Sequence, residues 1–120
     1  MRGHVNEFGE PIVQIGIPIG KRIHVMDAVI DTGFNSYVSI PEKIIKRCNW
    51  QCIGDEAYEL ANGATIHEKV YLGKIVFAGQ AQRAYIVSTK ADDILIGTKL
   101  LKGMELRINF KTNKIHVTAG

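Results

Sequence analysis

The sequence predicts an all-β protein with one or two short helices. Of its 120 residues 46% are hydrophobic, and 12 glycines against 3 prolines suit strands joined by tight turns. Several segments alternate apolar and polar residues, which is typical of strands with one buried face. No linker, low-complexity tract or shift in composition interrupts these segments, so we expect a single domain over residues 1–120. A chain of this length can bury a core without disulfides or a metal.

The first predicted hairpin ends at Asp31-Thr32-Gly33, the most informative tripeptide of the chain. Residues 12–19 are rich in β-branched side chains, Gly20-Lys21 makes a turn, and residues 22–30 return with a period of two. The returning strand loses its polar positions at residues 28–30. We therefore expect it to enter the core just before Asp31.

A short strand over residues 37–40 follows this tripeptide. Pro41-Glu42 then opens a predicted helical turn that runs to Cys48. Proline suits the first helical position, and an acidic residue is favourable near a helix N-terminus.

The middle of the chain predicts a long hairpin around Asn62-Gly63. Asn-Gly between two alternating segments is the strongest short-range hairpin signal, and the flanking segments here are residues 56–61 and 64–72. We expect the second strand to continue to Phe77, to turn, and to resume over residues 83–87.

A second apolar strand, residues 94–96, ends at Gly97. Residues 98–102 predict one or two helical turns, capped by Thr98 and stopped by Gly103. The last predicted hairpin joins residues 105–110 to 114–117.

Two parts of the chain follow one plan, in which a hairpin and a buried strand lead to a glycine turn and a helix. The first ends at Asp31-Thr32-Gly33 and the second at Ile96-Gly97. Two half-barrels related by an approximate two-fold axis would place the two glycine turns back to back in the middle of the molecule.

Asp31 is the main candidate for a catalytic residue. It leaves a buried strand at a turn that glycine permits, so we expect a rigid, partly dehydrated carboxylate near backbone N–H groups. Only one aspartate lies in such a position, and chemistry that needs paired carboxylates therefore requires a second copy of the chain. The tripeptide alone occurs by chance in roughly a few per cent of chains this long. A turn-initiating aspartate before glycine is the alternative interpretation.

Other acidic and histidine residues are weaker candidates. Asp92-Asp93 are adjacent on the chain, and adjacent strand residues point to opposite faces, so we interpret them as part of a polar loop. Asp55-Glu56 are interpreted as a solvated turn. The histidines His4, His67 and His116 have no serine, cysteine or acidic partner at a recognisable spacing, which argues against a histidine-based nucleophilic site.

Charge and cysteine content exclude several classes of protein. The net charge is +3 and the cationic residues are scattered along the chain, so no nucleic-acid partner is expected. No segment approaches the ~18 apolar residues of a membrane span, and residues 1–7 lack the apolar region of a secretory signal. We therefore expect a cytoplasmic protein without a membrane partner. Cys48 and Cys52 are expected to be free thiols, because no histidine or further cysteine pair completes a metal site.

Four separated segments together resemble the retroviral-type aspartic proteases, also called clan AA. They are residues 11–33 with Asp31-Thr32-Gly33, the segment Leu60-Ala61-Asn62-Gly63, residues 94–101 with Ile96-Gly97, and residues 106–110. The resemblance covers about residues 11 to 110 in matching order and spacing. It is closest to the small single-domain bacterial and archaeal members.

The resemblance implies a retropepsin-like closed β-barrel and a role for each matched residue. Asp31 is similar to the catalytic aspartate, Thr32 to the residue whose hydroxyl links two active-site loops across a dimer, and Gly33 to the glycine that supports the carboxylates. Ala61, Asn62 and Gly63 resemble the flap that folds over a bound peptide. Ile96-Gly97 is similar to the motif against which the active-site loop packs. Phe34-Asn35 departs from the viral pattern and resembles the microbial members.

The resemblance also implies an activity and a partner. It predicts an aspartic endopeptidase that acts as a homodimer on peptide or protein substrates, without a cofactor or metal. In viral relatives the chain termini interleave to hold the dimer, and residues 111–120 extend past the matched region, where they would replace or block that arrangement. The alternative is a peptide-binding or dimerisation module that holds an extended peptide by strand addition without cleaving it.

Overall fold

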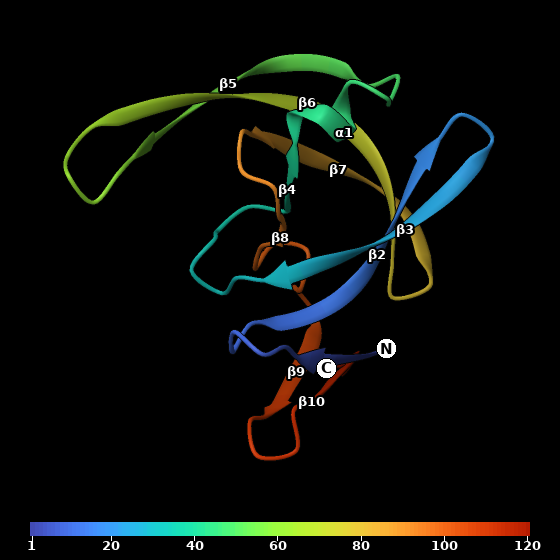
Figure 1. Ribbon diagram of the computed structural model, residues 1–120. Coiled ribbons are helices and arrows are strands. Elements are labelled where there is room, and N and C mark those ends of the chain that lie inside the picture. Colours follow the sequence, from blue (N-terminus) through green and yellow to red (C-terminus); the bar gives the residue numbers. More distant parts are fainter.

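The computed structural model describes residues 1–120 and contains ten strands and one short helix (Figure 1). Local alternation of apolar and polar residues accounts for most of the strands. In chain order the elements are β1 (Arg2–Val5), β2 (Pro11–Ile19), β3 (Arg22–Ile30), β4 (Val38–Pro41), α1 (Glu42–Ile45), β5 (Gln51–Glu59), β6 (Thr65–Phe77), β7 (Gln80–Thr89), β8 (Ile94–Ile96), β9 (Met104–Asn109) and β10 (Lys114–Ala119).

Six of the strands form a closed barrel, which confirms the predicted fold class. The strands run in the order β6-β7-β4-β8-β3-β2, and β2 closes the ring by pairing with β6 at Gly16 and Val76. Glycine favours the close approach here, because a Cβ atom at Gly16 would lie 3.1 Å from the Cβ of Val76 and 2.8 Å from Cγ2 of Ile23. Outside the barrel, β5 adds to β6, while β1, β10 and β9 add to β2.

The strand pairing has an internal two-fold symmetry. Exchanging β1–β4 with β5–β8 leaves the pairings among these eight strands unchanged, since β3 pairs parallel with β8 as β7 does with β4. The pairing of β1 with β10 has no counterpart, because β5 is an edge strand. The sequence comparison of the two glycine turns was therefore wrong in one respect. The comparison matched β3, the strand before Asp31, with β8. The symmetry instead makes β4 the counterpart of β8. The two turns are nevertheless adjacent, because β3 and β8 are parallel neighbours with Ile30 opposite Ile96.

The core fills the barrel and continues under β1 and β10. It is a cluster of 18 buried residues in which alternate strand positions point inward. Burying aliphatic side chains of this kind stabilises the fold by about 1.5–3 kcal/mol each. The largest fully buried members are Ile15, Ile17, Ile40, Ile75, Phe77, Ile86, Ile96 and Ile115.

Three local features differ from the sequence prediction. Strand β1 was not predicted, because its pairing with β10 joins the two ends of the chain and leaves no local signal. The helix α1 ends at Ile45 and continues only as turns toward Cys48. Residues 98–103 form consecutive turns instead of a helix, with hydrogen bonds such as Leu100 N–H to the Gly97 carbonyl at 3.2 Å. The span between Gly97 and Gly103 (φ +81°) is too short for a regular helix to propagate.

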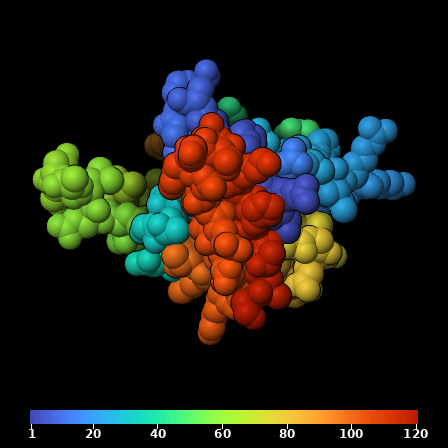
Figure 2. All heavy atoms as spheres, turned by 90° about the horizontal axis from the view of Figure 1, so that it is seen from below, coloured from blue at the N-terminus to red at the C-terminus, as the bar shows by residue number.

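Two hairpin arms extend beyond the barrel. The β5–β6 arm reaches out on the same side as the loop that follows β3, and the β2–β3 arm extends on the opposite side (Figure 1). Seen from below, the β5–β6 arm projects clear of the body (Figure 2). No helix has the length and apolar character needed to cross a membrane.

Candidate active site

Asp31 begins the loop between β3 and β4 and is held by its own backbone and by Gly33. Its N–H donates to the Ile96 carbonyl at 2.9 Å, and its carbonyl accepts from the N–H of Phe34 at 3.0 Å. The N–H of Gly33 donates to Oδ1 of the Asp31 side chain at 3.0 Å. The half-buried carboxylate is therefore fixed in place, while Oδ2 accepts no hydrogen bond within the chain.

The turn at Gly97 packs directly against this loop. The N–H of Gly97 donates to the Tyr37 carbonyl at 2.9 Å, that of Thr98 to Phe34 at 2.9 Å, and that of Lys99 to Ser36 at 3.1 Å. The hydroxyl of Thr98 also donates to the Phe34 carbonyl at 3.4 Å, so it does not cap a helix as the sequence predicted. These bonds fasten the whole loop of residues 31–37 to the end of β8.

Only glycine fits at position 97. A Cβ atom there would overlap the carbonyl oxygen of Ser36 and lie 2.8 Å from both the carbonyl oxygen and the ring Cδ2 of Phe34. The ring of Phe34 therefore packs over the space that the missing side chain leaves. Ile96, the neighbour of Gly97, is fully buried in the core.

Thr32 lies at the exposed tip of the same loop. Its side chain is exposed, and its hydroxyl makes no hydrogen bond within the chain. The structure therefore places Asp31, Thr32, Gly33, Ile96 and Gly97 in one contiguous unit, with Thr32 and one carboxylate oxygen left free.

An open groove of about 370 Å³ runs between this loop and the outer part of β5, close to the tip of the β5–β6 arm. Residues 33–36 and Lys99 form one wall, and Glu56, Ala57 and Tyr58 form the other. The sequence interpretation of Asp55-Glu56 as a solvated turn was wrong, because both residues belong to β5. Residues two apart on a strand share a face, so the alternation through Glu56 and Tyr58 was the signal that could have identified this wall.

Polar contacts fix both walls of the groove. The hydroxyl of Tyr58 donates to Oε2 of Glu56, and the pKa of Tyr58 is raised by partial burial first, then by this hydrogen bond and by the charges of Glu56 and Glu68. On the opposite wall the Lys99 ammonium lies 5.9 Å from the centre of the Tyr37 ring. Tyr37 in turn packs against Tyr85, with ring centres 5.8 Å apart.

The predicted flap residues lie at the tip of the β5–β6 arm. A five-residue loop, Leu60 to Ala64, replaces the predicted two-residue turn, and its ends are joined by the Leu60 N–H and the Ala64 carbonyl at 2.7 Å. Gly63 has a φ of +83°, and the side chain of Asn62 accepts from the Ala64 N–H at 3.0 Å. In this single chain the groove is lined by residues 56–58 of β5, just before the tip, and Ala61, Asn62 and Gly63 are not among its lining residues.

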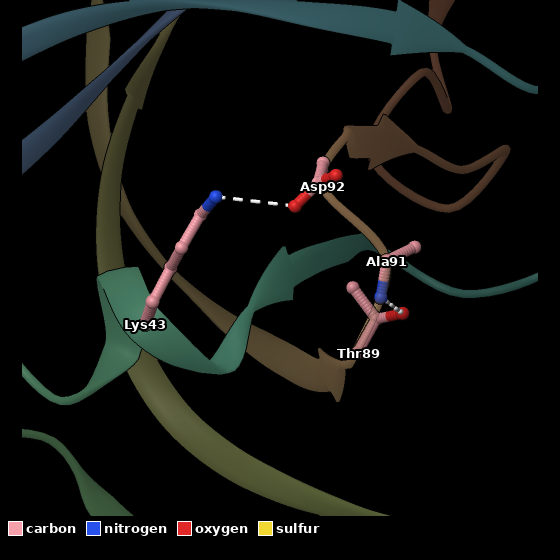
Figure 3. Close-up of polar contacts among 4 residues, drawn as sticks. All are labelled: Lys43, Thr89, Ala91 and Asp92. Carbon is pink, nitrogen blue, oxygen red and sulfur yellow. Dashed lines mark hydrogen bonds and ion pairs between the residues drawn. The ribbon is translucent and has the colours of Figure 1, made fainter.

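The other acidic pair lies elsewhere. Asp92 and Asp93 are in the bend between β7 and β8, and Asp92 points toward Lys43 of α1 at 3.1 Å (Figure 3). The neighbouring Thr89 hydroxyl accepts from the Ala91 N–H at 3.0 Å. By the internal two-fold this bend corresponds to the Asp31 loop, yet its carboxylate is paired on the surface and does not join Asp31.

The remaining candidates do not form a second centre. A separate cavity of about 390 Å³ between α1 and β6 is lined by residues that include His67, Cys48 and Trp50, and it shares no residue with the groove. Both cysteines are free, and burial raises the pKa of the Cys48 thiol. No three histidine, cysteine or acidic side chains gather where they could hold a metal ion.

No protein-family model and no curated protein sequence matches the chain. Among solved structures, it is similar to the foamy viral protease-reverse transcriptase in complex with RNA/DNA hybrid, with a TM-score of 0.56 and 21% identity. That match covers 82% of this chain but only 13% of the other, so the chain spans about an eighth of that protein. It is also similar to the Simian Foamy Virus (mac) protease, with a TM-score of 0.57, 17% identity, and coverage of 75% of this chain and 90% of that one.

These identities are low, so the likeness is one of fold. It covers about three quarters or more of this chain, which forms a closed six-stranded barrel. The chain therefore has the fold of a retroviral-type aspartic protease.

Proposed function

We propose that the protein is an aspartic endopeptidase that acts as a homodimer. The observation that carries this proposal is the Asp31 carboxylate. Its Oδ1 accepts a hydrogen bond, its Oδ2 is free, and the residues that follow Asp31 in the same loop form one wall of a groove. The fold shared with viral proteases supports a peptidase.

The chemistry requires two carboxyl groups at one water molecule. One carboxylate acts as general base and takes a proton from the water, while the other, protonated, donates a hydrogen bond to the scissile carbonyl. Two carboxyl groups about 3 Å apart share one proton, because both cannot ionise, a property taken here from aspartic proteases in general. The single chain brings no second carboxylate to Asp31, and a partner copy would supply its own Asp31 across a two-fold axis.

Thr32 supports this dimer. An exposed hydroxyl without a partner, next to the catalytic residue, is free to bond to the same loop of a second copy. The β5–β6 arm is nearly fully exposed along β5, and we propose that Ala61, Asn62 and Gly63 at its tip close over a bound peptide.

The chain termini differ from the interleaved arrangement expected in viral relatives. Strand β1 pairs with β10 of the same chain, and the N-terminal amine of Met1 donates to the Val117 carbonyl at 2.7 Å. We propose that the dimer is held mainly by the Asp31 loops and the arms, so it is weaker than one held by interleaved termini. We also propose that the chain is related most closely to the small bacterial and archaeal members, a proposal that the resemblance of Phe34-Asn35 to those members supports.

The proposal is tested by measuring peptide cleavage against protein concentration together with sedimentation. Specific activity should rise through the dimer dissociation constant and then reach a plateau, and a transition-state analogue should titrate one site per dimer. Asp31→Asn should abolish cleavage while the dimer persists. A dilute monomer with full specific activity, or a folded Asp31→Asn dimer that still cleaves, would exclude the shared site.

A peptide-binding module is the second candidate. Strand β5 is an edge of the sheet, so its free backbone groups can pair with an extended peptide beside the groove. Saturable peptide binding by both the wild-type protein and Asp31→Asn, without cleavage by either, would favour this function.

A further inference from the structure

The three-stranded unit of β1, β10 and β9 presents a polar outer surface that the proposed proteolysis does not use. Outward residues alternate with buried ones such as Ile115 and Val117. Directly opposite residues of antiparallel strands share a face. The register therefore gathers eight exposed side chains, which we call the terminal face: Arg2, His4, Glu105, Arg107, Asn109, Lys114, His116 and Thr118.

Three permanent cations lie close together on the terminal face. Arg2 and Arg107 are both opposite His116, so each is a diagonal neighbour of Lys114. Diagonal neighbours on antiparallel strands are about 7–8 Å apart, which is within the screening length of about 8 Å at physiological salt. The cations therefore repel one another, which costs stability unless an anion lies over them.

The chain provides little compensation for this repulsion. Glu105 is the only acidic residue of the unit, and its Oε1 is 3.9 Å from Nε of Arg107. Both side chains are more than half exposed, and such pairs contribute little.

The net charge of the whole protein comes from this unit. Residues 1–5 and 104–120 hold four Lys or Arg and one acidic residue, which equals the net charge of +3 of the chain. The remaining eleven cationic and eleven acidic side chains cancel. The field that the protein presents to an approaching anion is therefore centred on one surface.

A groove on this surface adds an aromatic side chain to the cations. It has a volume of about 550 Å³, and its lining includes Arg107, Lys114, His116 and Phe110 but no carboxylate. Phe110 is 65% exposed, so its ring is accessible beside the cations. Viewed from below, the β9–β10 hairpin covers the middle of this side of the molecule, with the N-terminal residues beside it (Figure 2).

We propose that the terminal face binds single-stranded nucleic acid. Phosphates lie on Arg2, Arg107 and Lys114, and a base stacks on Phe110. Stacking on an exposed aromatic ring beside a cationic groove is the general mode by which proteins hold single strands without sequence preference. An acidic peptide would satisfy the cations but leave the Phe110 ring unused. The proposal is independent of proteolysis, because the terminal face shares no residue with the Asp31 groove.

The cationic residues are scattered along the sequence, and the sequence alone therefore predicted no nucleic-acid partner. Arg2 is more than a hundred positions from Arg107 and Lys114, and only the pairing of β1 with β10 brings them together. Alternation along β9 and β10 also separates the cations in the sequence while placing them on one face.

The test is fluorescence anisotropy of a short labelled oligodeoxythymidine titrated with the full chain at several salt concentrations. With three phosphate contacts, a plot of the logarithm of affinity against the logarithm of salt concentration should have a slope of about −2. This slope corresponds to about a 16-fold loss of affinity between 50 and 200 mM salt. Arg107→Ala with Lys114→Ala should reduce the slope to about −0.7. The matched control, Lys21→Ala with Arg22→Ala at the exposed tip of the β2–β3 arm, should keep it.

The aromatic contact is tested separately. Phe110→Leu should weaken binding at least about fivefold, whereas Phe110→Tyr should retain it. The proposal is overturned if no binding occurs at low salt with about 100 µM protein. It is equally overturned if the control pair loses as much as the Arg107 and Lys114 pair. A labelled polyglutamate of the same length that binds as tightly would assign the face to acidic peptides instead.

Discussion

Substituting Gly97 by alanine tests whether the packing of the Asp31 loop depends on this glycine. The added Cβ would overlap the Ser36 carbonyl oxygen and press on Phe34 at 2.8 Å. Overpacking of this kind costs about 1–3 kcal/mol. Relief by moving the loop would weaken the three backbone hydrogen bonds between residues 97–99 and the loop, each worth about 1 kcal/mol.

Either route leads to a destabilisation of about 3 kcal/mol. For a chain of this size that corresponds to a fall of about 12 °C in Tm. Urea denaturation of wild-type and Gly97→Ala proteins at one protein concentration measures the difference. A fixed concentration is needed because dimer formation would itself change the apparent stability.

Gly33→Ala is the matched control within the same loop. Its Cβ would meet only Oδ1 of Asp31, at 3.3 Å, so we expect a loss below about 1 kcal/mol. Shortening Phe34 in the Gly97→Ala background should not restore stability, because the closest obstacle is a backbone carbonyl. Equal stability of Gly97→Ala and Gly33→Ala would refute the packing argument, as would full rescue by Phe34→Leu.

Three further predictions concern the active-site loop and the arm. Thr32→Ala should raise the dimer dissociation constant and lower activity at limiting protein concentration while leaving the Tm of the monomer within about 2 °C, as sedimentation and calorimetry will show. Amide exchange over residues 59–72 should be faster than over residues 25–30, because the outer part of the arm has no core beneath it. The raised pKa of Tyr58 means that the folded state holds its proton more tightly, so stability should fall as pH rises above about 10, the ordinary value. Tyr58→Phe should reduce that fall in urea titrations at high pH, and an unchanged pH profile would show that Tyr58 is not the cause.

Local sequence was sufficient to predict the all-β class and most hairpins. Alternation over residues 12–30 and the Gly20-Lys21 turn predicted the β2–β3 pair, because side-chain period and turn chemistry act within a few residues. The same local chemistry identified Asp31 at the end of a buried strand. The weakest local inferences were the helices, since short segments such as 98–102 depend on what they pack against.

The tertiary structure alone decided which distant residues meet. Parallel pairing of β3 with β8 placed Gly97 under the Asp31 loop, the fold of β5 brought Glu56 and Tyr58 to the groove, and pairing of β1 with β10 joined Arg2 to Lys114. Each of these contacts spans a long stretch of chain, and no pattern of neighbouring residues encodes it. The physical reason is that strand pairing across the barrel is selected by burial of the whole core, whereas periodicity reports only which face of a strand is buried.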